Sequence, residues 1–378
     1  MKRHLALLLI LIFALSLAAC GKHPADSLPS LREVTDSSSG AIKNIMFVVT
    51  GSLSGSTNND EVYRAISEYA ATVDGNVSAF ECSMDTALFE SALMQAAETE
   101  AYDLIVSCFD AMAEPVEKIA VKYPQQKFMI VDTAIDYSDN RNQNIISIQV
   151  MQNEGGFLAG AMSAMLTKAN HVDRINPEKI LGFVGAIESL AITDFLLGYI
   201  DGANYVDRSV KVIYSFVGNH TDTNLARDHA MAQYQQNADI VFVCGENGLG
   251  AAEAALEANK FVIGADFDYA QRLAIAGDSR ANNVLTSVIK DYYGMVFPTL
   301  VSANEGRLQW GEHIRISYTD GGVSLSDYNY AAGILPESFL EEYQSIVGAF
   351  VSGEIRIHTA YGASAAEIEA VKALTVAH

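Results

Sequence analysis

The stretch Asp239-Ile-Val-Phe-Val-Cys244 is an unbroken apolar run of strand type, and the glycine-rich turn Gly245-Glu-Asn-Gly-Leu-Gly250 follows it directly. An alanine-rich helical segment comes next, and Phe261-Val-Ile-Gly264 then predicts a second apolar strand that leads to Asp266. Strands that are apolar throughout and alternate with helices are typical of parallel sheets covered on both faces. The fold class that this stretch predicts is therefore α/β.

The same alternation extends outward from this stretch. Apolar strand patterns recur between residues 42 and 149 and again from residue 180 onward, with helical spacing between them. Between these two blocks, Gln152-Asn-Glu-Gly-Gly-Phe-Leu-Ala-Gly160 opens a helix whose small residues allow close packing. A chain of 378 residues exceeds what one core usually supports. We therefore expect two lobes, with this helix as the crossing into the second.

Two regions carry weaker patterns. Gly51–Asp60 is rich in Gly, Ser, Thr and Asn and predicts a loop, which a helix at Glu61–Thr72 follows. From Trp310 onward the sequence predicts short strands and a terminal helix at Ala365–Thr375, without a third core.

The charge balance excludes two classes of partner. The chain has 24 basic and 46 acidic residues, which give a formal net charge of -22. A strongly acidic surface repels nucleic acid and anionic lipid. Neither is an expected partner.

The first residues predict export rather than a folded element. An apolar run at Leu5–Leu15 is too short to span a membrane as a helix. Leu17-Ala-Ala-Cys20 follows and resembles the bacterial lipoprotein box, in which Cys20 becomes the lipidated N-terminus. The alternative is an ordinary secretory signal with an incidental cysteine. We expect a signal peptide at residues 1–19, a flexible tether at residues 20–40 and a lipid-anchored protein on the extracytoplasmic face of the cell membrane.

No motif supports catalysis, a cofactor or a metal. The turn after Cys244 has GxxGxG spacing, whereas the dinucleotide motif is GxGxxG, and no phosphate-loop lysine follows. GxSxG and HExxH are missing, and the eight histidines are scattered. The remaining cysteines, Cys82, Cys108 and Cys244, predict buried free thiols.

Polar groups follow three of the apolar strand runs. Asp132, Asp266 and Lys290 each stand where a strand ends, and ligands of open parallel sheets bind at that edge. Carboxylates accept hydrogen bonds from vicinal hydroxyls, and an ammonium donates to hydroxyl or carbonyl oxygens. Spacing alone leaves an alternative open, in which each group caps the next helix or forms a structural ion pair.

Several stretches, in this order, resemble the basic membrane lipoprotein (BMP, or PnrA-like) family. They are Leu17-Ala-Ala-Cys20, Asn153-Glu-Gly-Gly-Phe-Leu-Ala-Gly160, Gly182-Phe-Val-Gly185, Phe195-Leu-Leu-Gly-Tyr-Ile-Asp-Gly-Ala203, Ala238-Asp-Ile-Val-Phe-Val-Cys-Gly245, Ile263-Gly-Ala-Asp-Phe-Asp268 and Val284-Leu-Thr-Ser-Val-Ile-Lys290. The resemblance implies a substrate-binding protein of an ABC importer, in a family whose characterised members bind purine nucleosides. It also implies the type I periplasmic-binding-protein fold, with two Rossmann-like lobes joined by three crossings.

The resemblance also assigns lobes and site residues. It places residues 41–151 and about 266–308 in the N-terminal lobe, and residues 152–265 and about 309–378 in the C-terminal lobe. Asp266 and Lys290 match ribose-side polar groups, and Asp132 matches an acid at the corresponding strand end. Glu154 matches a glutamate near the hinge, as a ligand contact or as support. Gly245 begins the helix start that borders the cleft.

The first loop departs from the family pattern. Members carry an Asp-x-Ser/Gly-Phe-Asn run, whose phenylalanine stacks on the base; here Gly55 and Asn58 replace the acid and the ring, and Asn59 is retained. His220 corresponds roughly to the second stacking aromatic. We expect a monomer that binds a nucleoside-like small molecule and works with an ABC permease. A sugar-type ligand, and a lipoprotein that signals to a receptor, remain alternatives, while an enzyme acting on nucleosides has no catalytic constellation here.

Overall fold

The strands form two six-stranded sheets in the part of the chain that the computed structural model describes, which is residues 41–53, 57–169, 172–327, 335 and 337–374. These residues belong to one compact unit, Glu33–His378. The predicted signal peptide, the lipidation site Cys20 and the tether lie outside the described residues, as does Gly55.

The first sheet has the strand order β11-β5-β4-β3-β1-β2, and all of its pairs are parallel. The second has the order β12-β10-β9-β8-β6-β7, in which only the short β12 is antiparallel to its neighbour. The strands are β1 (Asn44–Val49), β2 (Asn76–Glu81), β3 (Leu104–Cys108), β4 (Phe128–Val131), β5 (Ile145–Val150), β6 (Ile180–Gly185), β7 (Lys211–Phe216), β8 (Ala238–Cys244), β9 (Phe261–Asp266), β10 (Val284–Lys290), β11 (His313–Ile316) and β12 (Val323–Leu325).

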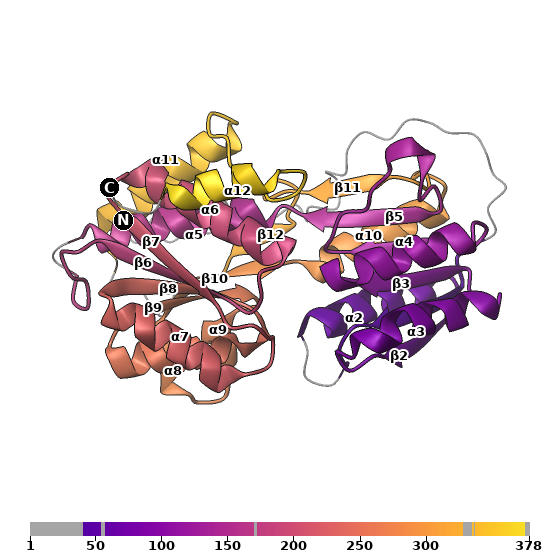
Figure 1. Ribbon diagram of the computed structural model, residues 1–378, viewed down its shortest axis with the longest axis horizontal. Helices are drawn as coiled ribbons and strands as arrows, with labels where there is room; N and C mark the ends of the chain where they lie inside the picture. Colours follow the sequence, from indigo (N-terminus) through magenta and orange to yellow (C-terminus); the bar gives the residue numbers. More distant parts are fainter. Residues whose placement is uncertain (1–40, 54–56, 170–171, 328–334, 336, 375–378) are drawn as a thin grey trace, which may run out of the picture. The chain divides into compact units, whose positions relative to one another are not determined.

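Helices cover both faces of each sheet (Figure 1). The first sheet carries α2 (Thr57–Thr72) and α10 (Tyr292–Asn304) on one face, and α3 (Thr86–Glu98) and α4 (Ala113–Lys122) on the other. The second carries α5 (Gln152–Thr167), α6 (Leu190–Val206), α11 (Glu337–Val351) and α12 (Ala365–Ala373) against α7 (Thr223–Gln235), α8 (Leu249–Ala258) and α9 (Tyr269–Ile275). Each sheet with its helices is called a lobe below.

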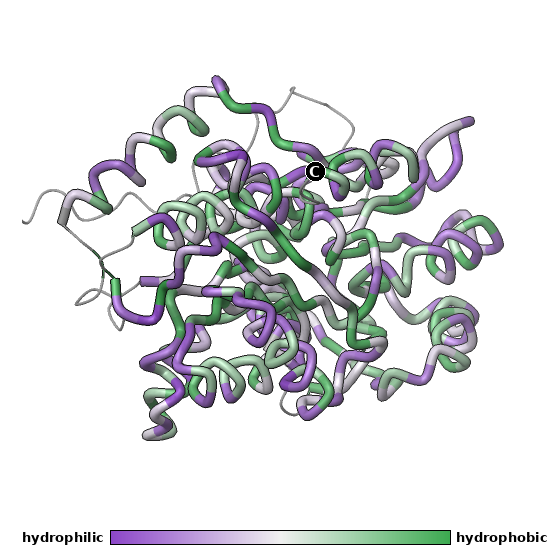
Figure 2. The backbone as a smooth tube through the Cα atoms, turned by 60° about the vertical axis from the view of Figure 1, so that its left-hand side comes forward, coloured by the Kyte–Doolittle hydropathy of each residue, from purple (hydrophilic) through white to green (hydrophobic). Residues whose placement is uncertain are grey.

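This two-sided cover explains the continuous apolar strands. All seven residues of β8 and all four of β4 are buried. Figure 2 shows hydrophilic and hydrophobic residues alternating along many of the helices, which each expose one side. The predicted α/β fold with two parallel-dominated sheets is confirmed.

The helix expected at the first crossing packs very closely on its neighbour. A Cβ placed on Gly160 of α5 would come 2.1 Å from the carbonyl oxygen of Tyr199, and one on Gly198 of α6 would come 1.9 Å from that of Asn153. Only glycine permits this approach at these positions. The predicted role of the small residues at 152–160 is therefore confirmed for α5 against α6.

Within the described residues the chain passes between the sheets three times, from β5 to α5, from β10 to α10 and from β11 to β12. The crossings are bonded to one another. The N–H of Met151 donates to the carbonyl of Ile316 at 3.0 Å, and the N–H of Asp291 donates to that of Gly322 at 3.1 Å. These bonds hold the three crossings in a single bundle.

The structure differs from the sequence expectations in several places. Residues 284–290 pair in the second sheet and residues 313–316 in the first, which is the reverse of the lobes expected for them. Helix α2 begins at Thr57 instead of Glu61, and α10 and α11 were not expected. An apolar strand reads alike in either sheet, so its pairing is decided by contacts far along the chain. No helix among the described residues is long and apolar enough to cross a membrane.

Candidate functional site

Four neighbouring strand ends carry a residue with positive φ. Phe109 follows β3 (φ 74°), Asp132 follows β4 (φ 63°), Gly245 follows β8 (φ 140°), and Asp266 ends β9 (φ 72°). Residues other than glycine rarely adopt this conformation, and those that do gather at functional sites. Phe109, with ψ 158°, lies in a region that is almost restricted to glycine. Two of the three polar groups predicted at strand ends, Asp132 and Asp266, thus also have an uncommon backbone conformation.

Lys290 and Asp132 form a buried ion pair between the two lobes. The Nζ of Lys290, at the end of β10, donates to Asp132 Oδ2 at 2.8 Å and to Oδ1 at 3.1 Å, and the Tyr292 hydroxyl donates to Oδ2 at 2.7 Å. The two charged side chains are only 3% and 4% exposed. Burial lowers the pKa of the Lys290 ammonium, but the carboxylates of Asp132 and Asp266 outweigh it and raise that pKa above its usual value. Lys290 is therefore a charged group inside the protein.

Asp132 and Asp266, the two acids around Lys290, differ in the hydrogen bonds that their carboxylate oxygens accept. Both oxygens of Asp132 accept hydrogen bonds, whereas Asp266 stands 3.9 Å from the Lys290 Nζ and its side chain is 16% exposed. Asp266 does not cap the following helix, because Asp268 accepts from the N–H of Gln271 and caps α9. An ammonium has three donors, and two of them point to Asp132. The ammonium also lies 5.0 Å from the centre of the Phe195 ring, and its distance of 3.9 Å from Asp266 is too long for a hydrogen bond.

His220 and Gly245 lie on the second-lobe side of this cluster. Burial lowers the pKa of His220 despite the opposing charges of Glu246 and Asp266, so its imidazole is neutral at pH 7. The Asn247 amide donates to the Asn219 carbonyl at 2.9 Å and ties the loop of His220 to the turn after β8. At Gly245, a Cβ would come 2.4 Å from the Cβ of Ala186, so this turn requires glycine. The structure therefore brings the His220 loop and the Gly245 turn together.

Asn59 is buried in the first turn of α2. The residue is 1% exposed, and its Oδ1 has no hydrogen-bond partner among the described residues. The hydroxyl of Thr50, at the end of β1, is also buried and unpartnered within that part of the chain. A buried acceptor without a partner is costly, unless a water or a ligand meets it. Asn59 makes no hydrogen bond to the Lys290 cluster across the described ranges.

Glu154 has a structural contact at the hinge. Its Oε2 accepts from the backbone N–H of Tyr318 at 2.6 Å, which links the first turn of α5 to the crossing between β11 and β12. Burial raises the pKa of this carboxyl, and the Tyr318 N–H opposes the rise. Of the two roles that the sequence left open, this bond favours support of the crossings.

Sequence reasoning missed four residues around this cluster. Tyr292 and Phe109 pack edge to face with ring centroids 6.2 Å apart, and Asp110 and Tyr361 are hydrogen-bonded at 3.1 Å. Phe109 follows a strand as the predicted acids do, so the same rule could have found it. Tyr361 lies 251 positions from Asp110, and no local sequence pattern predicts their contact.

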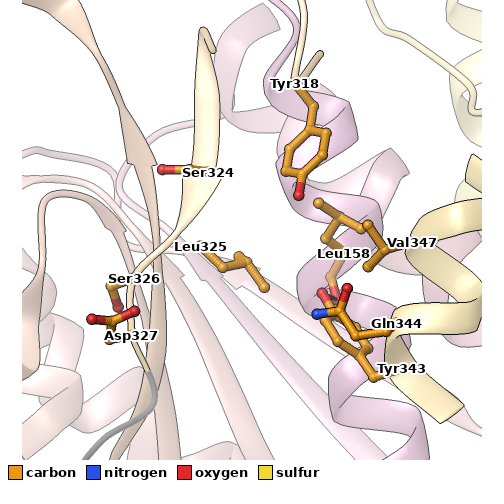
Figure 3. Close-up of a pocket in the computed structure, with 9 residues that line it drawn as sticks. All are labelled: Leu158, Tyr318, Ser324, Leu325, Ser326, Asp327, Tyr343, Gln344 and Val347. Atoms are coloured by element: carbon orange, nitrogen blue, oxygen red, sulfur yellow. Dashed lines mark hydrogen bonds between the residues drawn. The ribbon is translucent and has the colours of Figure 1, made fainter. Parts of the chain in front are cut away.

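Two cavities lie elsewhere in the second lobe. One of about 210 Å³ lies between α5, α11 and β12, with Tyr318, Leu325 and Tyr343 in its wall (Figure 3). The other, of about 640 Å³, lies between α6, α12 and the segment that joins α11 to α12. None of the predicted ligand-binding residues lines either one. We place the candidate site at the strand ends, because the strained backbone and the buried charges are there.

The remaining reactive groups offer no second site. Cys82, Cys108 and Cys244 are buried free thiols, and burial raises the pKa of each. The described residues contain no group of three His, Cys, Asp or Glu side chains that could hold a metal ion.

Residues 42–347 match the family described as PnrA-like ABC transporter substrate-binding proteins (Bmp). The ABC transporter nucleoside-binding protein BmpA of Lactococcus lactis subsp. cremoris is 29% identical over 240 residues, which cover 61% of this chain and 65% of that protein. The chain thus aligns with just under two thirds of that relative. The CD4+ T-cell-stimulating antigen of Listeria monocytogenes is 26% identical over 369 residues, 93% of this chain and 97% of that protein.

Solved structures share the fold. An ABC transporter solute-binding protein from Aeropyrum pernix K1 has a TM-score of 0.70 at 22% identity and covers 88% of this chain and 98% of its own. A carbohydrate transporter solute-binding protein from Agrobacterium radiobacter, solved with D-arabinose, has a TM-score of 0.59 at 17% identity, with 77% and 96% covered. With its matched residues and its two lobes joined by three crossings, the chain belongs to the PnrA-like (Bmp) family of ABC transporter substrate-binding proteins, whose members are transport components and not enzymes.

Proposed function

We propose that this ABC transporter substrate-binding protein binds a purine nucleoside at the strand ends around Lys290. The observation that carries the proposal is the difference between the two acids beside Lys290. Asp132, whose Oδ2 also accepts from the Tyr292 hydroxyl, holds the ammonium in place, while Asp266 keeps its carboxylate for the ligand. A carboxylate beside an ammonium suits a pair of vicinal hydroxyls, as on a ribose. The Lactococcus relative, named a nucleoside-binding protein, supports the same ligand class.

The ring of the ligand would meet a different surface from that of other family members. Asn58 stands where the family has its stacking phenylalanine, and Asn59 offers a buried amide oxygen without a partner among the described residues. Phe109 packs edge to face on Tyr292, and the charge of Asp266 acts on the neutral His220, so both rings lie beside this cluster. We infer that the base is bound more by amide hydrogen bonds and less by stacking than in the family pattern. Each lost stacking contact is worth about 1–3 kcal/mol.

Isothermal titration with a nucleoside panel tests the ligand class. The panel is adenosine, guanosine, inosine, uridine and cytidine, with D-ribose, D-arabinose and D-glucose as the sugar arm. We expect at least one purine nucleoside to bind more tightly than every sugar. Binding of sugars without nucleosides would assign the sugar alternative, and binding of neither would reject the proposed ligand class.

Paired variants test the residues. Asp266→Asn should weaken binding about tenfold or more, because hydrogen bonds to a charged group contribute roughly 1.5–3 kcal/mol. Lys260→Met is the matched control, since it removes a lysine from the buried pair Lys260–Asp239 near the opposite end of β8. Its affinity should equal that of the unmodified protein. Equal affinities for both variants would remove Asp266 from the site.

We further propose that Cys20 is lipidated and anchors the protein to the outer face of the cell membrane. The support is the Leu17-Ala-Ala-Cys20 sequence after a short apolar run. Cells treated with globomycin, which blocks lipoprotein signal cleavage, should accumulate a form that retains residues 1–19 and is heavier than the peptide-cleaved chain. An unlipidated product with the same mass in treated and untreated cells would contradict the anchor.

A further inference from the structure

The segment that joins α11 to α12 lies beyond the family match, which ends at residue 347. Its residues 357–361, called the strap below, are fastened to the second lobe. The backbone N–H groups of His358 and Ala360 donate to Asp201 and Asp194 of α6, both at 2.7 Å. The side-chain amide of Asn153, in the first turn of α5, donates to the His358 carbonyl at 3.0 Å. The strap therefore has a fixed position on α5 and α6.

Tyr361, at the end of the strap, reaches the first lobe. The residue is 8% exposed, and its hydroxyl donates to Asp110 Oδ1 at 3.1 Å. Asp110 follows β3 of the first sheet, and the hydroxyl of Thr133, after β4, fixes it at 2.7 Å. The other oxygen, Oδ2, accepts from the N–H of Ala191 at the start of α6, at 2.9 Å. One carboxylate of the first lobe thus accepts two hydrogen bonds from the second.

We propose that Asp110 and Tyr361 form a latch that holds the two lobes together and sets the balance between the closed and open forms. Both cross-lobe bonds end on a charged acceptor, which makes them stronger than bonds between neutral groups. A bond made only in the closed form shifts the population toward that form by its own free energy. The latch residues are not among the predicted ligand contacts. Tyr361, the tyrosine half of the latch, lies beyond residue 347, where the family match ends.

Distance measurements on the ligand-free protein test the latch. The full chain carries Cys20→Ser, and nitroxide labels are attached at Gln95→Cys on α3 and Leu256→Cys on α8, both exposed positions. The native Cys82, Cys108 and Cys244 are at most 1% exposed and stay unlabelled. Double electron–electron resonance then gives the distance distribution between the lobes. This experiment uses no ligand, so the nucleoside assignment can fail without affecting the outcome.

The unlatched variants are Tyr361→Phe and Asp110→Asn. We expect each to lower the ratio of the closed to the open distance about tenfold, as the loss of one hydrogen bond to a charged group predicts. Tyr234→Phe is the matched control, because its buried hydroxyl donates to the Phe261 carbonyl at 2.7 Å inside the second lobe. It should leave the distribution unchanged.

Three results would overturn the latch. The first is that both variants keep the distribution of the unmodified protein. The second is that Tyr234→Phe shifts it as far as they do, which would indicate a general loosening of the second lobe. The third is an unmodified, ligand-free protein with no population at the closed distance.

Discussion

Two aspartates in this protein, Asp132 and Asp194, are both buried but have different partners. Asp132 faces the Lys290 ammonium and the Tyr292 hydroxyl, whereas within the described residues Asp194 accepts hydrogen bonds from neutral donors alone, the hydroxyl of Thr359 and backbone N–H groups. Burial raises the pKa of both carboxyls. At Asp194 the neutral donors and, to a smaller extent, the charge of Lys290 oppose the rise and leave that pKa at about 7, whereas at Asp132 the Lys290 ammonium is the largest opposing influence.

The comparison shows that burial has different consequences for the charge of a carboxylate, depending on its partners. Asp132 lies next to the Lys290 ammonium and can hold this cation in place. A ligand site needs a cation in a fixed position. Burial raises the pKa of Asp194 to about 7, so we expect its hydrogen bonds to the strap to respond to pH near neutrality. One cluster builds the candidate binding site, and the other fastens a C-terminal segment.

The largest effect is expected when the cation is removed. Lys290→Met leaves Asp132 buried without its counter-charge, and breaking such a pair from one side costs about 3–5 kcal/mol of unfolding free energy. Urea denaturation measures it. Asp132→Asn combined with Lys290→Met should recover part of the loss, because no unpaired charge remains.

Lys260→Met provides the control. It breaks the pair with Asp239, which keeps hydrogen bonds from Thr167 at 2.6 Å and Asn176 at 2.7 Å, so the loss should be smaller. A loss for Lys290→Met no greater than this would mean that Asp132 does not depend on the ammonium.

The second effect is a pH dependence from Asp194. Its pKa is about 7 in the folded protein and 3.8 as the ordinary value, so the folded state binds the extra proton between these values. Its contribution to stability is therefore complete below about pH 4 and is lost as the pH rises through 7. The loss is on the order of 4 kcal/mol, since one pKa unit corresponds to about 1.4 kcal/mol. Chemical denaturation at steps from pH 4 to 8 should show it, and Asp194→Asn should remove this fall.

Asp207→Asn is the matched control for that slope. The backbone N–H of Ser209 lowers the pKa of Asp207 to about 2, so this carboxyl titrates below the tested range. The variant should keep the decline of the unmodified protein between pH 4 and 8. An Asp194→Asn protein with the same decline would locate the titrating group elsewhere.

Much of the fold could be predicted from the sequence because its signals are local. Apolar runs such as those at β8 and β9, with helical spacing between them, predict covered parallel strands wherever they occur. The partner of β10 is not a local property, and so its lobe was assigned wrongly. The first turn of α2 is polar, Thr57-Asn-Asn-Asp60, and resembles a loop until packing of the later turns fixes the helix.

The candidate site was predictable to a similar extent. The rule that ligands meet strand ends predicted Asp132 and Lys290, and the structure brings these two together. It could not distinguish a satisfied acid from an available one, since that depends on Tyr292 and on distances within the cluster. The contact of Tyr361 with Asp110 joins residues 251 positions apart, through a segment with no motif.

The smallest effect on stability is expected at Asp266, and it separates the two acids beside Lys290. Asp266 lies 3.9 Å from the ammonium and has φ 72°, a conformation that asparagine tolerates as well as aspartate. Asp266→Asn should therefore change the unfolding free energy by no more than about 0.5 kcal/mol, the usual range for a residue outside the packed core. Thermal denaturation checks this on the same sample that is used for nucleoside titration. A variant that keeps its stability and loses its ligand identifies an acid reserved for binding, whereas a loss of about 2 kcal/mol or more would make Asp266 a structural partner of Lys290 like Asp132.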